Sequence, residues 1–456
     1  MTSGAPPILR RSASHLAIMR LVLGYTEAAM NRISRRTLIL SALLAAPLAA
    51  QVLPRVPPEK AGFSSDRLAR IDALVEHHIA AGDLAGAVTL IARHGKIVHL
   101  GVHGMADREA GRPMKEDTIF RIASMTKPIT SVAAMMLYEE GKFLLSDPVA
   151  KYLPEFAHMT VLPPGAPPGS TPVPAKRPIT IRHLLTHTAG FTYHWNPRIG
   201  PLYNAYGIPH GLGPTPYTLA EAMKLLAKIP LVNHPGEQWE YGLSIDVLGR
   251  LVEVASGMSL DEFFRRRIFE PLGMKDTYFY LPPEKTARLA AVYGKNKDGK
   301  LVRVEDEDVR AGEASGSTDY PYAGPKKYFS GGGGLCATAL DYARFAQMIL
   351  NKGRLGDARL LSPKTVEFMT MDHLGHIVKN PPLAFGLGFA IDTSERGFTE
   401  LTSEGTHGWG GFWYTEFFIS PETDMIGVFM AQLYPDGGLE VKQKLKVLAH
   451  QAIIEE

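Results

Sequence analysis

Apolar residues along this chain follow different periods in different regions. Residues 87–92 and 96–102 are two apolar runs on either side of His94-Gly95, and this pattern predicts a β-hairpin. Three further runs toward the C-terminus also predict strands: 385–391, 412–419 and 425–433. Strand signals therefore lie near both ends of the chain.

Helical spacing, with apolar residues three or four positions apart, is the other main pattern. The segments with this spacing are 64–75, 219–229, 244–255, 339–350 and 439–454. A proline-rich stretch at 163–168 interrupts the mostly helical region 130–279 and predicts an irregular surface excursion. Residues 286–327 hold few apolar residues in sequence, so we expect long surface connections there.

Sheet signals at both ends, with helix signals between them, are typical of an α/β fold in which both termini build one domain. We predict an antiparallel sheet flanked by helices, with an inserted all-helical domain. The predicted parts are a leader and signal peptide (1–50), the first part of the α/β domain (51–129), a helical domain with insertions (130–285), and connecting loops with the second part of the α/β domain (286–456).

Composition adds limits to this picture. The chain has 456 residues, of which 45% are hydrophobic, so it can bury a large core. Its formal net charge is only +3 and no long Lys/Arg block occurs, so no nucleic-acid partner is predicted. The lone Cys336 can form no internal disulfide and has no metal-type spacing, so we expect a small buried hydrophobic residue.

The N-terminal region has the pattern of an export signal. Basic residues, among them Arg35-Arg36, precede an apolar run at 38–48 and the small residues Ala49-Ala50. The arginine pair is typical of a twin-arginine signal, with Met30 as a possible start. A short membrane anchor is the alternative, but this run is well below the roughly 20 residues that span a bilayer. We predict an exported protein, periplasmic or secreted, with no stable membrane span in the mature chain.

The strongest chemical signal is the segment 120–128, in which Ser124 is the only serine followed three residues later by lysine. Residues three apart share a helix face, so a helix that begins at Ser124 places the amine of Lys127 beside the hydroxyl. This pairs a nucleophile with a base, and the free Ser124 N–H at the helix start is a candidate oxyanion donor. The alternative is that Ser124 only caps a helix.

Two further segments supply candidate partners. Tyr241 precedes a predicted helix, and an adjacent ammonium such as Lys127 favours the phenolate form of a tyrosine, so the two could share the serine proton. Trp409, Gly410 and Gly411 lead into a predicted strand, where glycines permit close approach of a ligand and the N–H of Phe412 could be a second oxyanion donor. Taken alone, Tyr241 could equally be a packing residue, and the glycines could form a bulge.

In their order along the chain, these segments resemble the serine β-lactamase and penicillin-binding-protein superfamily, most closely the class C-like branch that includes the family VIII carboxylesterases. Ser124-Met125-Thr126-Lys127 is similar to its S-x-x-K motif, Tyr241 to the tyrosine of Y-x-N, and Trp409-Gly410-Gly411 to the third motif. Residues 181–190, 269–274 and 331–341 are also similar to recurrent family stretches. The resemblance implies an α/β domain and a helical domain with the site between them.

Two departures bear on the substrate. Position 243 is leucine where β-lactamases carry the asparagine of Y-x-N, and position 409 is tryptophan where they carry lysine. Both changes remove polar groups that hold a β-lactam or peptide carboxylate, so an uncharged ester fits better. His183 and His187 have a spacing that could bind zinc, but without an H-E-x-x-H pattern we interpret them as structural. No G-x-S-x-G occurs, which argues against an α/β-hydrolase triad.

The leading hypothesis is an exported serine hydrolase that cleaves small carboxylic esters through an acyl-enzyme. Ser124 attacks, Lys127 and Tyr241 move the proton, the N–H groups of Ser124 and Phe412 hold the oxyanion, and Trp409 lines the substrate pocket. No cofactor or metal is expected. The alternatives are a β-lactamase or D-amino-acid peptidase of the same fold, and a penicillin-binding sensor that acylates without turnover. The natural ester and the oligomeric state are left open.

Overall fold

The described residues of the computed structural model are 1–2, 53–163, 165–167, 169–305, 316–379 and 383–455. By their contacts, residues Val52–Glu456 form one compact unit. The predicted signal peptide lies outside the described residues. The predicted boundaries at 129/130 and 285/286 stay predictions.

The predicted hairpin is the starting point of the sheet. β1 (Gly86–Arg93) pairs antiparallel with β2 (Lys96–Asp107), with Val88 opposite Val102. His94 and Gly95 both have positive φ, 53° and 68°, as a two-residue turn that matches the strand twist requires. β16 (Met425–Met430) pairs antiparallel with the other edge of β1, so the two ends of the chain meet in the centre of the sheet.

The complete sheet has eight strands among the described residues, in the order β12-β13-β14-β15-β16-β1-β2-β3, and every neighbouring pair is antiparallel. The remaining strands are β3 (Arg112–Pro113), β12 (Ala384–Phe385), β13 (Ala390–Ile391), β14 (His407–Gly411) and β15 (Thr415–Ser420). The predicted fold class, an antiparallel sheet flanked by helices, is confirmed.

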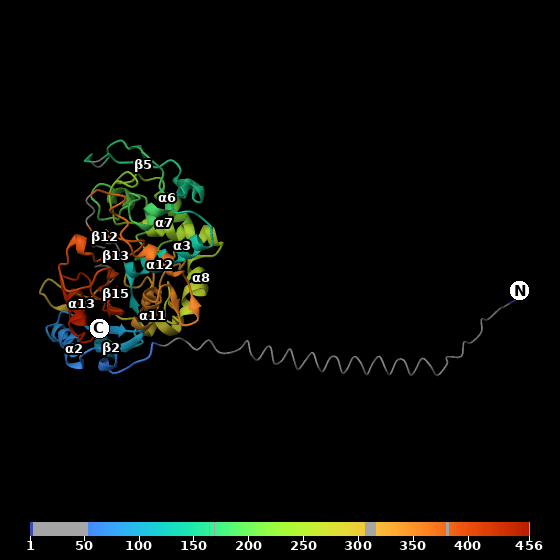
Figure 1. Ribbon diagram of the computed structural model, residues 1–456. Helices are drawn as coiled ribbons and strands as arrows, with labels where there is room; N and C mark the ends of the chain where they lie inside the picture. The colour runs from blue at the N-terminus through green and yellow to red at the C-terminus, as the bar shows by residue number, and fades with distance from the viewer. Residues whose placement is uncertain (3–52, 164, 168, 306–315, 380–382, 456) are drawn as a thin grey trace. The chain divides into compact units, whose positions relative to one another are not determined.

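Helices cover both faces of this sheet (Figure 1). On one face lie α2 (Ser65–Ala80) and α13 (Val441–Gln451), which contact each other and pack over a core that includes Ile71 and Phe429. On the other face α11 (Ala339–Leu350) contacts β1, β15 and β16. Side-chain caps explain where two of these helices begin, since Ser64 accepts from the N–H of Arg67 and Thr338 from that of Asp341.

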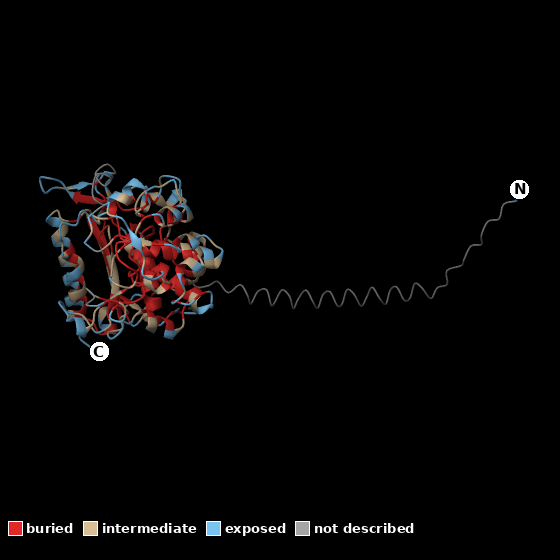
Figure 2. Ribbon diagram, turned by 90° about the horizontal axis from the view of Figure 1, so that it is seen from above, coloured by how far each residue is buried: buried red, intermediate tan, exposed pale blue. Residues whose placement is uncertain are grey.

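The other α-helices among the described residues adjoin α11 through the larger core. They are α3 (Thr126–Glu139), α4 (Ile181–Leu185), α5 (Gly200–Ala205), α6 (Leu219–Leu226), α7 (Ser244–Ser256), α8 (Leu260–Phe264), α9 (Glu270–Leu272) and α12 (Pro363–Met369). α7 packs on α3 and α4, and Gly257 ends it in the left-handed conformation at φ 73°. Figure 2 shows the buried residues concentrated around these packed helices and the sheet.

Three expectations need correction. The predicted strand 385–391 is two short strands, β12 and β13, separated by a turn in which Gly388 has φ 99°. The predicted strand 412–419 begins only at Thr415, because the chain turns at Tyr414, which has φ 72°. Within the predicted loops 286–327, β7 (Tyr293–Lys295) and β8 (Leu301–Arg303) form a small antiparallel pair.

The excursion at 163–168 lies between β5 (Thr160–Val161) and β6 (Val173–Pro174), which pair with each other. Cys336 is fully buried, and burial raises the pKa of its thiol to about 12, so it is a packing residue as predicted. Across the described part of the chain, no helix is both long and apolar enough to cross a membrane.

Candidate active site

A sharp turn between a strand and a helix presents Ser124. β4 (Phe120–Arg121) pairs with β9 (Cys336–Ala337), and the chain then forms a single 3-10 turn, Ala123–Met125, before α3 begins at Thr126. Ala123 has φ 42°, a left-handed value that costs a non-glycine residue about 1 to 3 kcal/mol. The helix thus starts two residues later than expected, and Ser124 lies in the turn that enters it.

The buried Lys127 ammonium has three oxygen acceptors around it. Its Nζ donates to Ser124 Oγ at 3.0 Å, to Tyr193 OH at 3.0 Å and to the carbonyl of Gly332 at 2.7 Å. These three bonds use all three N–H donors of an ammonium. The ammonium also lies 4.6 Å from the centre of the Tyr241 ring, a favourable cation–π distance. The structure therefore brings Ser124 and Lys127 together in the geometry that their spacing predicts.

Tyr193 is a site residue that the sequence analysis missed. Its side chain is buried, and burial together with nearby Tyr241 and Asp246 raises the pKa of its phenol well above the ordinary value. The phenol is therefore neutral and accepts a hydrogen bond from Lys127. One sequence signal could have drawn attention to it, because aromatic residues alternate at Phe191, Tyr193 and Trp195 within a region of otherwise helical spacing.

Tyr241 and Trp409 are joined to each other. Tyr241 lies three residues before α7, and its OH accepts a hydrogen bond of 3.0 Å from Trp409 Nε1 in β14. Trp239 stacks on the Tyr241 ring with 5.9 Å between ring centres, which limits where that ring can move. The second and third motifs of the sequence therefore form one hydrogen-bonded pair.

Glycine in the third motif lets β14 approach the serine turn. A Cβ on Gly411 would lie 2.1 Å from Thr415 Oγ1 and 2.4 Å from the carbonyl oxygen of Ile122. Any larger residue would push the strand away from Ser124. Gly410 is different, because its Cβ would meet nothing nearer than 3.5 Å. Phe412 follows directly after β14, and its ring packs 4.7 Å from that of Tyr434.

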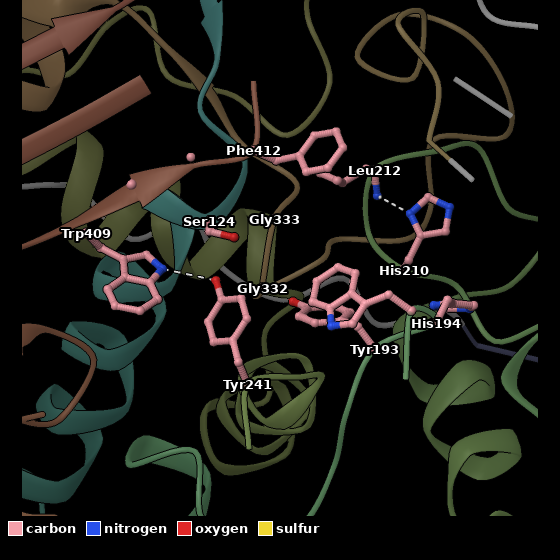
Figure 3. Close-up of a pocket in the computed structure, with 13 residues that line it drawn as sticks. Ser124, Tyr193, His194, His210, Leu212, Tyr241, Gly332, Gly333, Trp409 and Phe412 are labelled. Carbon is pink, nitrogen blue, oxygen red and sulfur yellow. Dashed lines mark hydrogen bonds between the residues drawn. The ribbon is translucent and has the colours of Figure 1, made fainter. Parts of the chain in front are cut away.

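These residues surround a pocket of about 320 Å³. Figure 3 shows Ser124 facing the space between Trp409, Tyr241 and Phe412, with His210 at the far side. The lining residues are Ser124, Tyr193, His194, Trp195, His210, Leu212, Tyr241, Gly332, Gly333, Trp409, Gly410, Gly411 and Phe412. Among these described lining residues none is Asp, Glu, Lys or Arg, so the pocket suits an uncharged, largely apolar ligand.

The two histidines with zinc-like spacing have other surroundings. His183 Nδ1 accepts from the N–H of Thr180 at the start of α4, and burial with Arg177 and Arg182 nearby lowers the pKa of His183 to about 4. His187 is fully buried against the rings of Trp239 and Tyr241. Within the described ranges, no group of three His, Cys, Asp or Glu side chains is arranged to hold a metal ion.

A serine on a helix-entry turn, bonded to a buried lysine and packed against β14 of an antiparallel sheet, defines the class of this protein as a serine hydrolase. The chain belongs to the Beta-lactamase family, whose family model matches residues 71–451. This confirms the family that the three motifs resemble.

Individual relatives agree with that assignment. Esterase EstB of Burkholderia gladioli is 34% identical over 77% of this chain and 86% of its own length. Lovastatin esterase of Penicillium rubens is 29% identical over 82% of this chain and 96% of its own. The solved structure titled EstCE1, a hydrolase with promiscuous acyltransferase activity, matches with a TM-score of 0.72 at 29% identity, covering 86% of this chain and 99% of that one.

Proposed function

We propose that this protein is a carboxylesterase that works through a covalent acyl-enzyme on Ser124. The observation that carries the proposal is the 3.0 Å hydrogen bond between Lys127 Nζ and Ser124 Oγ at the floor of an uncharged pocket. A lysine at this distance is within reach of the proton that the serine must lose. The esterase relatives support the same reaction class.

In the acylation step, Ser124 Oγ attacks the ester carbonyl carbon. The new Oγ–C bond forms, and the bond from that carbon to the alcohol oxygen breaks. Lys127 and Tyr241 pass the serine proton to the departing alkoxide, which leaves as the alcohol. The Trp409 N–H holds the Tyr241 oxygen in place during this transfer.

We assign the oxyanion to the backbone N–H groups of Ser124 and Phe412. Ser124 lies in the turn that enters α3, where the first N–H groups lack helical partners. Phe412 follows β14, which glycine holds close to that turn. Water then attacks the acyl carbon and the bond from that carbon to Ser124 Oγ breaks. A proton from the water returns to Ser124 Oγ through the same groups, and the acid is released.

The substrate that fits best is an ester with an uncharged, apolar or aromatic acyl or alcohol group. Trp195, Trp409 and Phe412 supply wide apolar surfaces to the pocket. A substrate carboxylate would find no cation among the described lining residues, and each charge-assisted bond that is missing forgoes about 1.5 to 3 kcal/mol. We therefore expect β-lactams and D-amino-acid peptides to react more slowly than neutral esters.

Acyl transfer to an alcohol is a second candidate function. The observation that favours it is the apolar lining, which can hold an alcohol beside the acyl-enzyme in place of water. The relative of known structure with acyltransferase activity supports this possibility. Adding a primary alcohol to an ester assay should yield the exchanged ester at the expense of the acid, and a product that is entirely acid would rule the second function out.

The proposal is tested with Ser124→Ala and a fluorophosphonate probe. The variant should lose essentially all ester turnover while keeping the circular dichroism spectrum and melting temperature of the parent, because only a small hydroxyl is removed. The probe should label Ser124 alone in the parent. Full activity in the variant, or labelling of a different serine, would refute the assignment.

A substrate panel separates the esterase from its alternatives. Short p-nitrophenyl esters should be cleaved at least about tenfold faster than a chromogenic cephalosporin or a D-Ala-D-Ala peptide, since about 1.4 kcal/mol corresponds to that factor. Faster turnover of either of the other substrates would make the protein a β-lactamase or peptidase. A burst of product without turnover on every substrate would indicate a penicillin-binding sensor.

A further inference from the structure

A buried carboxylate lies behind the site, against the backbone of the lining residue Gly332, and is not itself one of the residues that line the pocket. Asp246 is in the first turn of α7 and is fully buried. Its Oδ1 accepts a hydrogen bond of 2.6 Å from Ser330 Oγ and a weaker one of 3.3 Å from Tyr328 OH. The proposed mechanism gives this group no task, although a buried carboxylate is costly unless a positive charge or several donors compensate it.

One glycine separates this carboxylate from the catalytic lysine. A Cβ on Gly332 would lie 2.3 Å from Asp246 Oδ2, so the backbone of Gly332 passes directly against the carboxylate. Oδ2 has no hydrogen bond of ordinary geometry among the described residues, although the nearby N–H of Gly332 favours its ionised form. On its other side, Gly332 offers its carbonyl to Lys127 Nζ at 2.7 Å.

Lys127 has no carboxylate among its hydrogen-bond partners in the described structure, because its three acceptors are the neutral oxygens of Ser124, Tyr193 and Gly332. An ammonium buried in this way needs a negative charge nearby to compensate the water that it has lost. Asp246 lies close enough to interact with this ammonium. Burial raises the pKa of Asp246 above its ordinary value, and the hydrogen bond from Ser330 and the charge of Lys127 offset part of that rise.

We propose that Asp246 is a positioning residue of this reaction, whose buried carboxylate acts across Gly332 on the groups that move the serine proton and so sets the pH above which the serine can be activated. The inference rests on the proposed function. Gly332 is the spacer between the two groups, because only glycine leaves room for the carboxylate on one side and the ammonium on the other.

The other titratable groups around the pair do not supply this charge near neutral pH. Tyr193 and Tyr328 face Asp246, and burial raises the pKa of each phenol well above its ordinary value, so both stay neutral. His187 faces Lys127 and is neutral as well, because burial lowers its pKa well below the ordinary value. Tyr241 faces the ammonium with its ring, whose centre is 4.6 Å from Lys127 Nζ.

The decisive measurement is kcat/KM for a p-nitrophenyl ester against pH in Asp246→Asn. Its acid limb should move to lower pH by about one unit, the effect of removing one nearby opposite charge, with little change in KM. The acid limb should move to lower pH whether Lys127 or Tyr241 accepts the serine proton, because removal of a negative charge makes any neighbouring acid stronger.

The matched control is Asp341→Asn. Asp341 is also a buried carboxylate, but it binds Thr277 and Arg344 at the start of α11. This variant should lose thermal stability and keep the parent position of the acid limb. An acid limb that stays in place in folded Asp246→Asn, or one that moves equally in Asp341→Asn, would overturn the inference.

A second pair of variants keeps the inference testable if Asp246→Asn does not fold. Ser330→Ala and Tyr328→Phe each remove one donor that favours the ionised carboxylate, so each should move the acid limb in the same direction by a smaller amount. No movement in either would overturn the role of Asp246. An active Ser124→Ala would refute the proposed function itself, so the two failures are distinguishable.

Discussion

Tyr193 is the residue whose role depends most on the folded structure. It is one of three acceptors around Lys127 Nζ and lies 66 positions away in sequence. Replacing it with phenylalanine leaves a buried ammonium N–H without its acceptor, and such a bond to a charged group is worth about 1.5 to 3 kcal/mol. Because the loss of this bond leaves Lys127 less firmly positioned beside Ser124, Tyr193→Phe should lower kcat by about 10- to 100-fold.

The control for this variant is Tyr203→Phe. Tyr203 is also fully buried, but its OH accepts from the N–H of Thr192 and makes no bond to Lys127. A similar loss of kcat in both variants would mean that Tyr193 acts through packing alone.

Tyr241→Phe tests the proton transfer directly. Removal of a general acid–base group costs about 10² to 10⁴ in rate. The phenylalanine ring should still stack on Trp239, so KM and the melting temperature should change little. The measurement is kcat for two esters with different leaving groups. An unchanged kcat for both would mean that Tyr241 has only a packing role.

At the scale of elements, the approach of β14 to the serine turn is the contact that assembles the site. Gly411→Ala should separate the two, because its Cβ would lie 2.4 Å from the backbone oxygen of Ile122. We expect a melting temperature lower by several degrees and a large loss of ester turnover, since about 1 kcal/mol moves the midpoint of a large domain by roughly 2 to 4 °C.

Gly410→Ala is the comparison for that strand. Its Cβ would have 3.5 Å to its nearest neighbour, so the fold should keep its melting temperature. Equal destabilisation by both substitutions would show that the close approach at Gly411 is not the cause of the effect.

Across the whole molecule, stability should depend on pH through a contact between α2 and β2. His103 Nε2 is 2.8 Å from Asp72 Oδ1, and this hydrogen bond raises the pKa of His103 above its ordinary value. The stabilisation is therefore fully present below the unfolded pKa of about 6.5 and is lost as pH rises through the higher folded value. His103→Gln should lower the melting temperature more at about pH 5.5 than at about pH 9.

Two neighbours fit this expectation. Asp72 stays ionised at both pH values. Burial alone would raise the pKa of Asp72, but the hydrogen bond from His103 together with the charges of His99 and His103 lowers it overall. His99, whose pKa burial lowers, acts with the opposite sign but is present in both proteins. His94→Gln serves as the control, because the His94–Asp424 pair is largely exposed and such pairs contribute little. A pH-independent loss in His103→Gln would contradict the linkage.

Export is a further proposal about the whole molecule. If the twin-arginine pattern directs the chain across a membrane, protein recovered from the periplasm should begin near Gln51. Replacing Arg35 and Arg36 with lysine should retain the protein in the cytoplasm, which cell fractionation would measure. Exported protein that still carries residues 38–48 would argue for an anchor.

The sequence by itself determined those parts of the protein that depend on local pattern. The hairpin β1–β2 follows from two apolar runs around His94-Gly95, and α7 ends where Gly257 can adopt a positive φ. Ser124 and Lys127 meet because their spacing of three residues brings them to the same side of the turn that enters α3. The order of the three motifs was enough to indicate the family.

Only the tertiary structure decided which distant groups surround these residues. Tyr193 and Asp246 reach the lysine through packing of segments that have no pattern in common, so no local rule could pair them. The turn at 412–414 also depends on tertiary contacts, since the rings of Phe412 and Trp413 pack on Tyr434 from a distant segment. Local preference forms the elements, whereas burial of charge and close approach at glycine select how they meet.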